Sequence, residues 1–204
     1  MHTLVYEYGG VPPEFFPVLP RHILREYVRY CAVHDPSLSK EDLDALWAVD
    51  NAASADGELI ITGPFAESAL SRVSEYSRMI PNDWESEFDV PPPLHTLIVL
   101  SSPFQSTLMS LLPPTLTHLA LLNIPSISLH TLPALLPLLT VLDLSFNPWL
   151  GTRYGKFTRL EWNKWTRLEL LGLRECAIGD VVVWTLKKTI NQGRLIDVEI
   201  ILAN

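Results

Sequence analysis

The sequence predicts an α/β solenoid, in which a parallel β-sheet forms one face and short helices or turns form the other. Five segments in the second half of the chain share apolar residues at positions 1, 4 and 6. They are LHTLIV from Leu94, LTHLAL from Leu116, LTVLDL from Leu139, LELLGL from Leu168 and LIDVEI from Leu195. Such units bury their apolar side only by stacking on one another, so the pattern predicts a continuous sheet.

Two of these segments continue to a turn residue at position 9, Asn147 and Cys176. The combined pattern, L-x-x-L-x-L-x-x-N/C, is the signature of leucine-rich repeats. Side chains alternate along a strand, so positions 1, 4 and 6 should point into the core and positions 3, 5 and 7 onto the concave face. The expected core residues are Leu94, Leu97, Val99, Leu116, Leu119, Leu121, Leu139, Leu142, Leu144, Leu168, Leu171, Leu173, Leu195, Val198 and Ile200.

Residues 1–57 are expected to form an N-terminal arm and a helical cap. Residues 1–19 are rich in aromatic residues and proline without a clear period, which favours an extended arm. A helix is expected after Pro20, because apolar residues follow at helical spacing up to Cys31. Ser39 and Asp42 resemble a capping box for a second short helix, which would contain Leu43, Leu46, Trp47 and Val49.

Residues 58–93 are interpreted as a degenerate capping repeat followed by an acidic, proline-rich linker. ELIITGPF from Glu58 parallels LIVLSSPF from Leu97 almost position for position. A solenoid has to cover its exposed apolar end, which favours a capping role for this copy. The leucine-rich repeats then occupy residues 94–204. The last two intervals are the longest, 29 and 27 residues, and VVVWTLKKTI from Val181 is expected to form a helix there.

The predicted concave face is apolar in its first repeats and charged in its later ones. An exposed apolar strip requires a cover, which would be a protein partner or the chain's own Phe15–Phe16 or Trp84–Phe88 segment. The candidate partner-binding residues on this face are Ile98, Leu100, His118, Ala120, Leu122, Asp143, Arg174, Asp197 and Glu199.

The interval 145–165 is a second candidate surface, because aromatic and basic residues alternate along it. Trp149, Tyr154 and Trp162 are candidate partner contacts, since aromatic enrichment is typical of interface hot spots. Two alternatives remain open. The rings would pack the long loop, or they would stack on single-stranded nucleic acid.

Composition and motifs argue against several other classes of protein. The 204 residues carry 23 acidic and 15 basic side chains, a net charge of −8, which disfavours nonspecific binding of nucleic acid. Two cysteines are too few for a disulfide framework, and no apolar run or leader pattern is present, so we expect a soluble protein of the cytoplasm or nucleus. No phosphate loop, nucleophile elbow or metal motif occurs, so we expect no catalysis, cofactor or metal.

Two stretches resemble a known family. LELLGLRECAIGD, Leu168 to Asp180, resembles the cysteine-containing leucine-rich repeats that are common in F-box proteins, the substrate receptors of SCF ubiquitin ligases. LPRHILREYV, Leu19 to Val28, resembles the start of an F-box. The resemblance implies that residues 19–50 contact the Skp1 adaptor. The other interpretation is that the apolar residues between Pro20 and Cys31 belong to a helical cap. We expect a noncatalytic protein-interaction module or scaffold, with the F-box receptor as the alternative.

Overall fold

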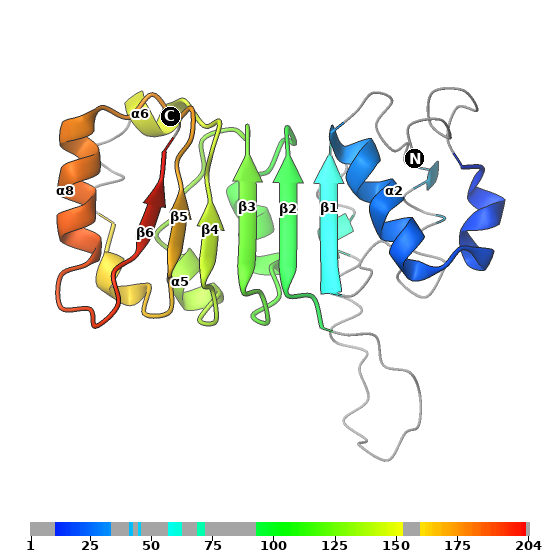
Figure 1. The fold of residues 1–204 in the computed structure, drawn as a ribbon, viewed down its shortest axis with the longest axis horizontal. Coiled ribbons are helices and arrows are strands. Elements are labelled where there is room, and N and C mark those ends of the chain that lie inside the picture. The colour runs from blue at the N-terminus through cyan, green and yellow to red at the C-terminus, as the bar shows by residue number, and fades with distance from the viewer. Residues whose placement is uncertain are drawn as a thin grey trace, which may run out of the picture.

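The structure is a computed structural model, and it describes residues 11–33, 41–42, 45, 57–62, 69–71, 93–152 and 160–202. Its centre is a six-stranded, all-parallel β-sheet whose strands follow one another in sequence order, as Figure 1 shows from right to left. The strands are β1 (Glu58–Thr62), β2 (Thr96–Leu100), β3 (His118–Leu122), β4 (Val141–Asp143), β5 (Leu170–Gly172) and β6 (Glu199–Ile201). The α/β class and the parallel sheet are therefore confirmed.

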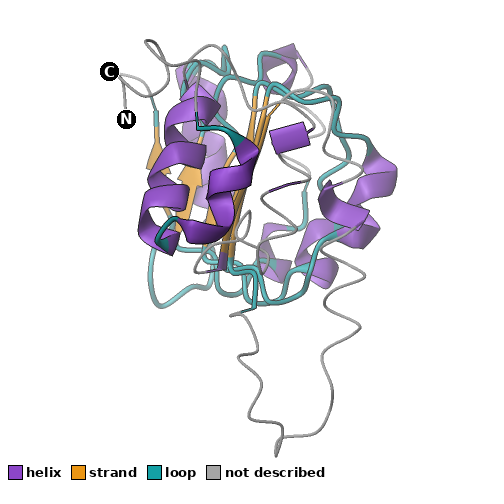
Figure 2. Ribbon diagram, turned by 90° about the vertical axis from the view of Figure 1, so that its right-hand side faces the viewer, coloured by secondary structure: helices purple, strands orange, loops and turns teal. Residues whose placement is uncertain are grey.

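Short helices precede, connect and flank the strands. They are η1 (Pro13–Val18), α2 (Arg21–Val33), η4 (Ser106–Leu111), α5 (Leu132–Leu135), α6 (Trp149–Thr152), η5 (Trp162–Lys164) and α8 (Asp180–Ile190). Helix α8 confirms the helix predicted from Val181. No described helix lies in front of β2–β5 in Figure 1. In Figure 2, which views the sheet edge-on, helices and loops that connect the strands lie to the right of the sheet. We call the uncovered side of the sheet the open face.

The alternation of the strands puts one row of side chains into the core, as the repeat pattern predicts. In both β1 and β2, the second and fourth residues are buried and the other three are half-buried. Every predicted core residue from Leu94 to Leu173 is buried, and so is Val198. Ile200 is only half-buried but contacts the same core.

The last repeat begins two residues later than the leucine pattern predicts. Glu199 lies opposite Leu170 and Ile200 lies opposite Leu171, so these residues take positions 3 and 4. The prediction that Leu195 belongs to the core was wrong, because Leu195 is fully exposed in the turn between α8 and β6. The turn is fixed by Asn191, whose Oδ1 accepts a hydrogen bond of 2.8 Å from the backbone N–H of the buried Val198.

The copy that starts at Glu58 is confirmed as a strand, with a register one residue away from the predicted one. Glu58 lies opposite Thr96 rather than Leu97, so Leu59 and Ile61 point into the core. The Pro64-Phe65 part of the match lies outside the described residues, as do nearly all of the predicted linker and the predicted apolar positions of the second short helix.

Residues 11–33 cover the N-terminal edge of the sheet. Helix α2 lies beside β1 (Figure 1), with Leu24, Tyr27, Val28 and Cys31 buried. Residues 13–18 form the 3-10 helix η1 instead of the predicted extended arm. A single six-residue element leaves no visible period, and its buried Phe16 contacts Tyr27 with 5.8 Å between ring centroids.

Candidate functional site

The open face consists of two main rows of side chains that run across all six strands. Their members share a register position in neighbouring strands, where adjacent strands are about 4.8 Å apart. Position 3 holds Glu58, Thr96, His118, Val141, Leu170 and Glu199, and position 5 holds Ile60, Ile98, Ala120, Asp143, Gly172 and Ile201.

The structure brings the four predicted apolar residues of this face together and adds a fifth. Ile60, Ile98 and Ala120 are register partners, and Leu100 is the register partner of Leu122. All five are half-buried, so each keeps apolar area in contact with solvent. We call these five residues the apolar strip. Ile60 was missed because it lies in the degenerate copy, although the alternation of Leu59 and Ile61 around it would have identified it.

The described arm residues do not cover this strip. Phe16 lies in η1 and is buried in the cap against Tyr27 of α2. Phe15 is 51% exposed. The Trp84–Phe88 segment lies outside the described residues. Among the described residues, therefore, the proposed self-cover by Phe15–Phe16 is not formed.

Asp143 lies on the open face but is held by its own turn. Its Oδ1 accepts hydrogen bonds from the backbone N–H of Ser145 at 2.9 Å and from Ser145 Oγ at 2.5 Å. Ser145 Oγ in turn accepts a bond of 3.0 Å from the backbone N–H of Arg174. A Cβ at Gly172 would lie 2.2 Å from Asp143 Oδ1, so a larger residue at this position would displace the Asp143 carboxylate from its place beside Ser145. Asp143 therefore organises the β4–β5 turn as well as facing solvent.

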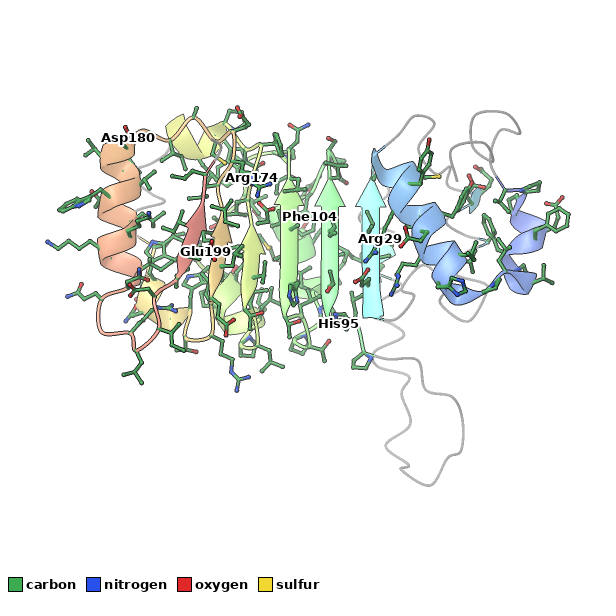
Figure 3. The ribbon with its side chains drawn as sticks, in the orientation of Figure 1. Arg29, His95, Phe104, Arg174, Asp180 and Glu199 are labelled. Carbon is green, nitrogen blue, oxygen red and sulfur yellow. The ribbon has the colours of Figure 1, made fainter. Side chains whose placement is uncertain are left out.

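The other charged candidates lie toward the C-terminal part of the face. Figure 3 shows Arg174 at the upper end of β5 and Glu199 on β6, and both side chains are exposed. His118 is also exposed, with its Nδ1 2.8 Å from Thr117 Oγ1. Asp197 does not occupy the predicted position 3, because the two-residue shift of the last repeat gives that position to Glu199.

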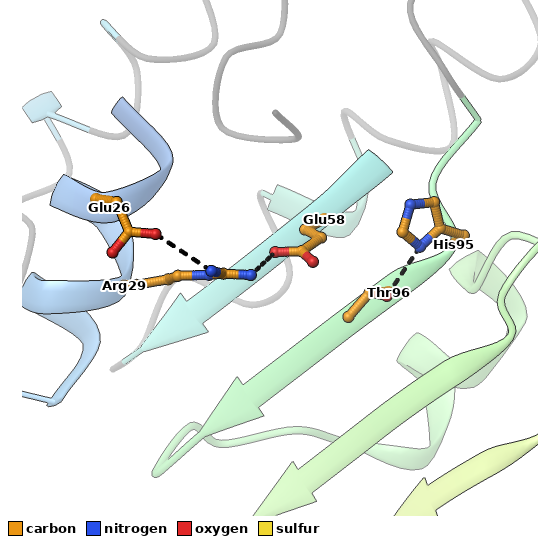
Figure 4. A network of polar contacts seen from close by, with 5 residues as sticks. All are labelled: Glu26, Arg29, Glu58, His95 and Thr96. Atoms are coloured by element: carbon orange, nitrogen blue, oxygen red, sulfur yellow. Dashed lines mark hydrogen bonds and ion pairs between the residues drawn. The ribbon is translucent and has the colours of Figure 1, made fainter. Parts of the chain in front are cut away.

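A charged border links the cap to the first strand of the open face (Figure 4). Arg29 of α2 donates to Glu58 Oε2 at 2.5 Å and to Glu26 Oε1 at 3.3 Å. The hydrogen bond to Glu58 is the main cause that raises the pKa of Arg29. Beside it, His95 Nδ1 lies 2.9 Å from Thr96 Oγ1. The apolar strip thus has a polar margin at the amino ends of β1 and β2.

The second candidate surface is largely internal where the structure describes it. Trp162 is 1% exposed and lies against Trp165, with ring centroids 5.6 Å apart. Trp149 is half-buried, and its Nε1 donates to the backbone carbonyl of Ile124 at 3.0 Å. Tyr154 lies outside the described residues. Burial favours the loop-packing alternative for Trp162 and leaves Trp149 at the surface, where it helps to line a shallow hollow of about 390 Å³.

The turns after β2–β5 share a geometry that the leucine pattern did not reveal. Position 8 is left-handed in each, with φ between 49° and 63° at Ser101, Asn123, Phe146 and Glu175. Position 9 is buried in each, at Ser102, Ile124, Asn147 and Cys176.

The two residues predicted to fill position 9 bind neighbouring backbone carbonyls. Asn147 Nδ2 donates to the carbonyl of Leu121 at 2.6 Å and to that of Leu144 at 2.8 Å. Cys176 Sγ donates to the carbonyl of Leu144 at 3.1 Å, and burial raises the pKa of its thiol. Both residues therefore hold one repeat to the one before it.

Neither a group of reactive side chains in the part that the structure describes nor a similar protein assigns a function to the chain. Among the described residues, no three His, Cys, Asp or Glu side chains are grouped so that they could hold a metal ion. None of the helices in the described ranges has the length and apolar character that a membrane crossing requires. No family model, no curated protein and no solved structure matches the chain significantly. Function therefore has to be inferred from the arrangement of the residues.

Proposed function

We propose that the chain is a leucine-rich-repeat solenoid that acts as a noncatalytic interaction module and binds a protein partner on its open face. Three features repeated along the chain support the repeat assignment. Positions 1, 4 and 6 are buried, position 8 is left-handed and position 9 is buried, from the repeat at Leu94 to the repeat at Leu168. The register of β2–β5 aligns these positions without a break.

The apolar strip is the observation that carries the binding proposal. It spans three adjacent strands on a sheet face that no described helix covers, and exposed apolar patches of this kind mark interaction sites. Its margin is polar, with the Arg29–Glu58 pair at the amino end of β1 and His118 at the amino end of β3. An apolar centre with a polar rim is the usual anatomy of a protein interface. The partner that fits it presents apolar anchor side chains.

The proposal is tested by affinity purification of the tagged chain from its native cells, followed by mass spectrometry. The variant is Ile98→Glu, which places a carboxylate in the middle of the strip on a half-buried, outward position. The control is Val18→Glu, since Val18 is 75% exposed and lies in η1, beyond α2. Both variants are first checked for an unchanged thermal transition by circular dichroism.

We expect Ile98→Glu to lose at least one partner that the wild-type chain and Val18→Glu both retain. A charge buried at an interface without a counterion costs several kcal/mol, which is about a hundredfold or more in affinity. Identical partners with all three proteins would overturn the assignment to the open face. Asp143 is a poor probe, because replacing it would also disturb the Ser145 turn.

The same experiment tests the alternative function, that of an F-box substrate receptor. The apolar stripe of α2 is buried within the chain, next to β1, as expected for a cap. No described residue favours a contact with an adaptor. Recovery of Skp1 and a cullin with the wild-type chain would promote the alternative, and their absence would remove it.

A further inference from the structure

A different helix lies beside each of the two edge strands of the sheet. At the N-terminal end, α2 lies beside the edge strand β1 (Figure 1). At the other end, β6 pairs with β5 alone, and α8 stands beside it as the outermost described element. The inner side of α8 is buried through Val183, Leu186 and Ile190.

The outer side of α8 and the turn after it carry large exposed apolar side chains. Val181 is 78% exposed, Trp184 is 65% exposed and Ile196 is 74% exposed, and Leu195 is fully exposed. We call these four residues the C-terminal patch. Large exposed apolar side chains on one helix and the turn that follows it mark interaction sites, so this patch is expected to be covered by another molecule.

Helix α8 carries opposite charges at its two ends, with an aromatic side chain between them. Asp180 lies in the first turn, at the upper end of α8 in Figure 3, and Lys187 and Lys188 lie in the last turn. Trp184 stands midway between them, with Lys188 Nζ 5.5 Å from its ring centroid. Within the described ranges, neither Asp180 nor Lys187 forms an ion pair. An acid, an aromatic ring and a base in this order are complementary to the same surface turned by 180°.

We propose that the C-terminal patch binds a second copy of this chain, with the two α8 helices antiparallel around a two-fold axis near Trp184. In this arrangement Asp180 of each copy faces Lys187 and Lys188 of the other, while the two indoles meet at the centre. A two-fold interface uses the same residues on both copies, so the self-complementary charge order favours a second copy over an unrelated partner. An anionic membrane surface fits less well, because Asp180 lies beside the exposed Val181 and Trp184.

The dimer is independent of the proposed function. The C-terminal patch lies beyond β6, whereas the apolar strip lies on β1–β3. Two copies joined through α8 therefore leave both strips open. Loss of self-association would leave partner recovery by the open face unchanged, and the reverse also holds.

The test is sedimentation of the full-length chain across roughly a hundredfold range of concentration. We expect the mass of the wild type to rise from 23.0 kDa toward twice that value. Trp184→Ala should weaken self-association about tenfold or more, as for a central aromatic hot spot. Val18→Ala, at the opposite end of the molecule, is the matched control and should leave it unchanged. A wild type that stays at 23.0 kDa throughout, or an unaffected Trp184→Ala, overturns the proposal.

Charge reversal tests the antiparallel arrangement and guards against misfolding as an explanation. Asp180→Lys alone, and Lys187→Glu with Lys188→Glu, should each reduce self-association, because like charges then meet at both ends of the interface. Mixing the two variants makes every pair opposite in sign again, so the mixture should associate as strongly as the wild type. Folding of each variant is confirmed by circular dichroism. A mixture that associates no better than its components overturns the antiparallel assignment.

Discussion

Asn147 joins two neighbouring repeats through one fully buried side chain. Its amide donates to the carbonyls of Leu121 and Leu144, and its Oδ1 accepts a bond of 2.9 Å from the N–H of Ile124. Asn147→Ala leaves two buried backbone groups, the carbonyl of Leu121 and the N–H of Ile124, without these partners, whereas the carbonyl of Leu144 keeps the Cys176 thiol. Because each unsatisfied group costs about 1–3 kcal/mol, we expect a loss of roughly 2 kcal/mol or more in the free energy of unfolding. Urea denaturation measures this loss.

Asn163→Ala is the matched control for that prediction. Asn163 is exposed, and surface substitutions away from structural features usually change stability by less than about 0.5 kcal/mol. Similar losses for the two variants would show that the hydrogen bonds of Asn147 contribute little.

The raised pKa of the buried Tyr27 predicts that the stability of the fold decreases at alkaline pH. The Tyr27 ring is buried and its hydroxyl accepts a bond of 3.3 Å from the N–H of Val11. Burial is the main cause that raises the pKa of Tyr27 to about 12, and the charges of Cys31 and Asp42 act in the same direction. The unfolded chain loses this proton near pH 10.0, whereas the folded chain holds it. The neutral phenol therefore stabilises the fold fully below pH 10.0, and this stabilisation is lost as the pH rises toward 12.

Tyr27→Phe isolates this contribution. The variant should be less stable at neutral pH by about 1 kcal/mol, because the Val11 bond is lost. It should then lose less stability than the wild type as the pH rises from 10 to 11, because it has no phenol to ionise. Cys31 titrates in both proteins and so does not distinguish them. Equal slopes in urea denaturation series at these pH values would refute the role of the buried phenol.

Among the elements, the cap is held mainly by apolar burial rather than by its ion pair. Leu24 is 1% exposed, so Leu24→Ala should reduce the free energy of unfolding by about 2–5 kcal/mol. The Arg29–Glu58 pair keeps 43% and 24% of its side chains exposed, and Arg29→Ala should cost less than about 1 kcal/mol. Thermal or urea unfolding of the two variants decides between them. A larger effect of Arg29→Ala would make the ion pair the main fastening of α2.

The registers of the elements show what a sequence pattern determines and what it leaves open. Strands β2–β5 follow from the leucine spacing, because one alignment places all their apolar positions inside. In β6 a shift of two residues preserves the alternation, so the pattern cannot distinguish Leu195 from Asp197 as the start. The turn made by Asn191 and Val198 decides the register instead.

The candidate site was predictable where it depends on alternation and not where it depends on tertiary contacts. Ile98, Leu100, Ala120 and Leu122 follow directly from the strand period. The Arg29–Glu58 pair joins residues 29 positions apart in different elements, and no local pattern signals it. The left-handed position 8 is also hidden, because of its four residues only Asn123 is a type that is enriched in this conformation.

At the scale of the whole molecule, each strand depends chiefly on its immediate neighbours. Strand β3 has a strand on both sides and buried residues at Leu119 and Leu121. Strand β6 has three residues, none fully buried, and one neighbouring strand. In a stack of repeats such as the one we propose, local stability is the sum of each repeat's own contribution and its contacts with its neighbours. The stack should therefore open first at its C-terminal end.

Amide hydrogen exchange followed by mass spectrometry tests this order of opening. At concentrations where the chain is monomeric, amides of β6 and α8 should exchange at least about tenfold faster than those of β2–β4, because they open without disrupting the central strands. Raising the protein concentration should slow exchange in α8 selectively if its outer side contacts a second copy. Uniform protection across all six strands would show instead that the sheet unfolds as one cooperative unit and that its C-terminal end is no weaker than its centre.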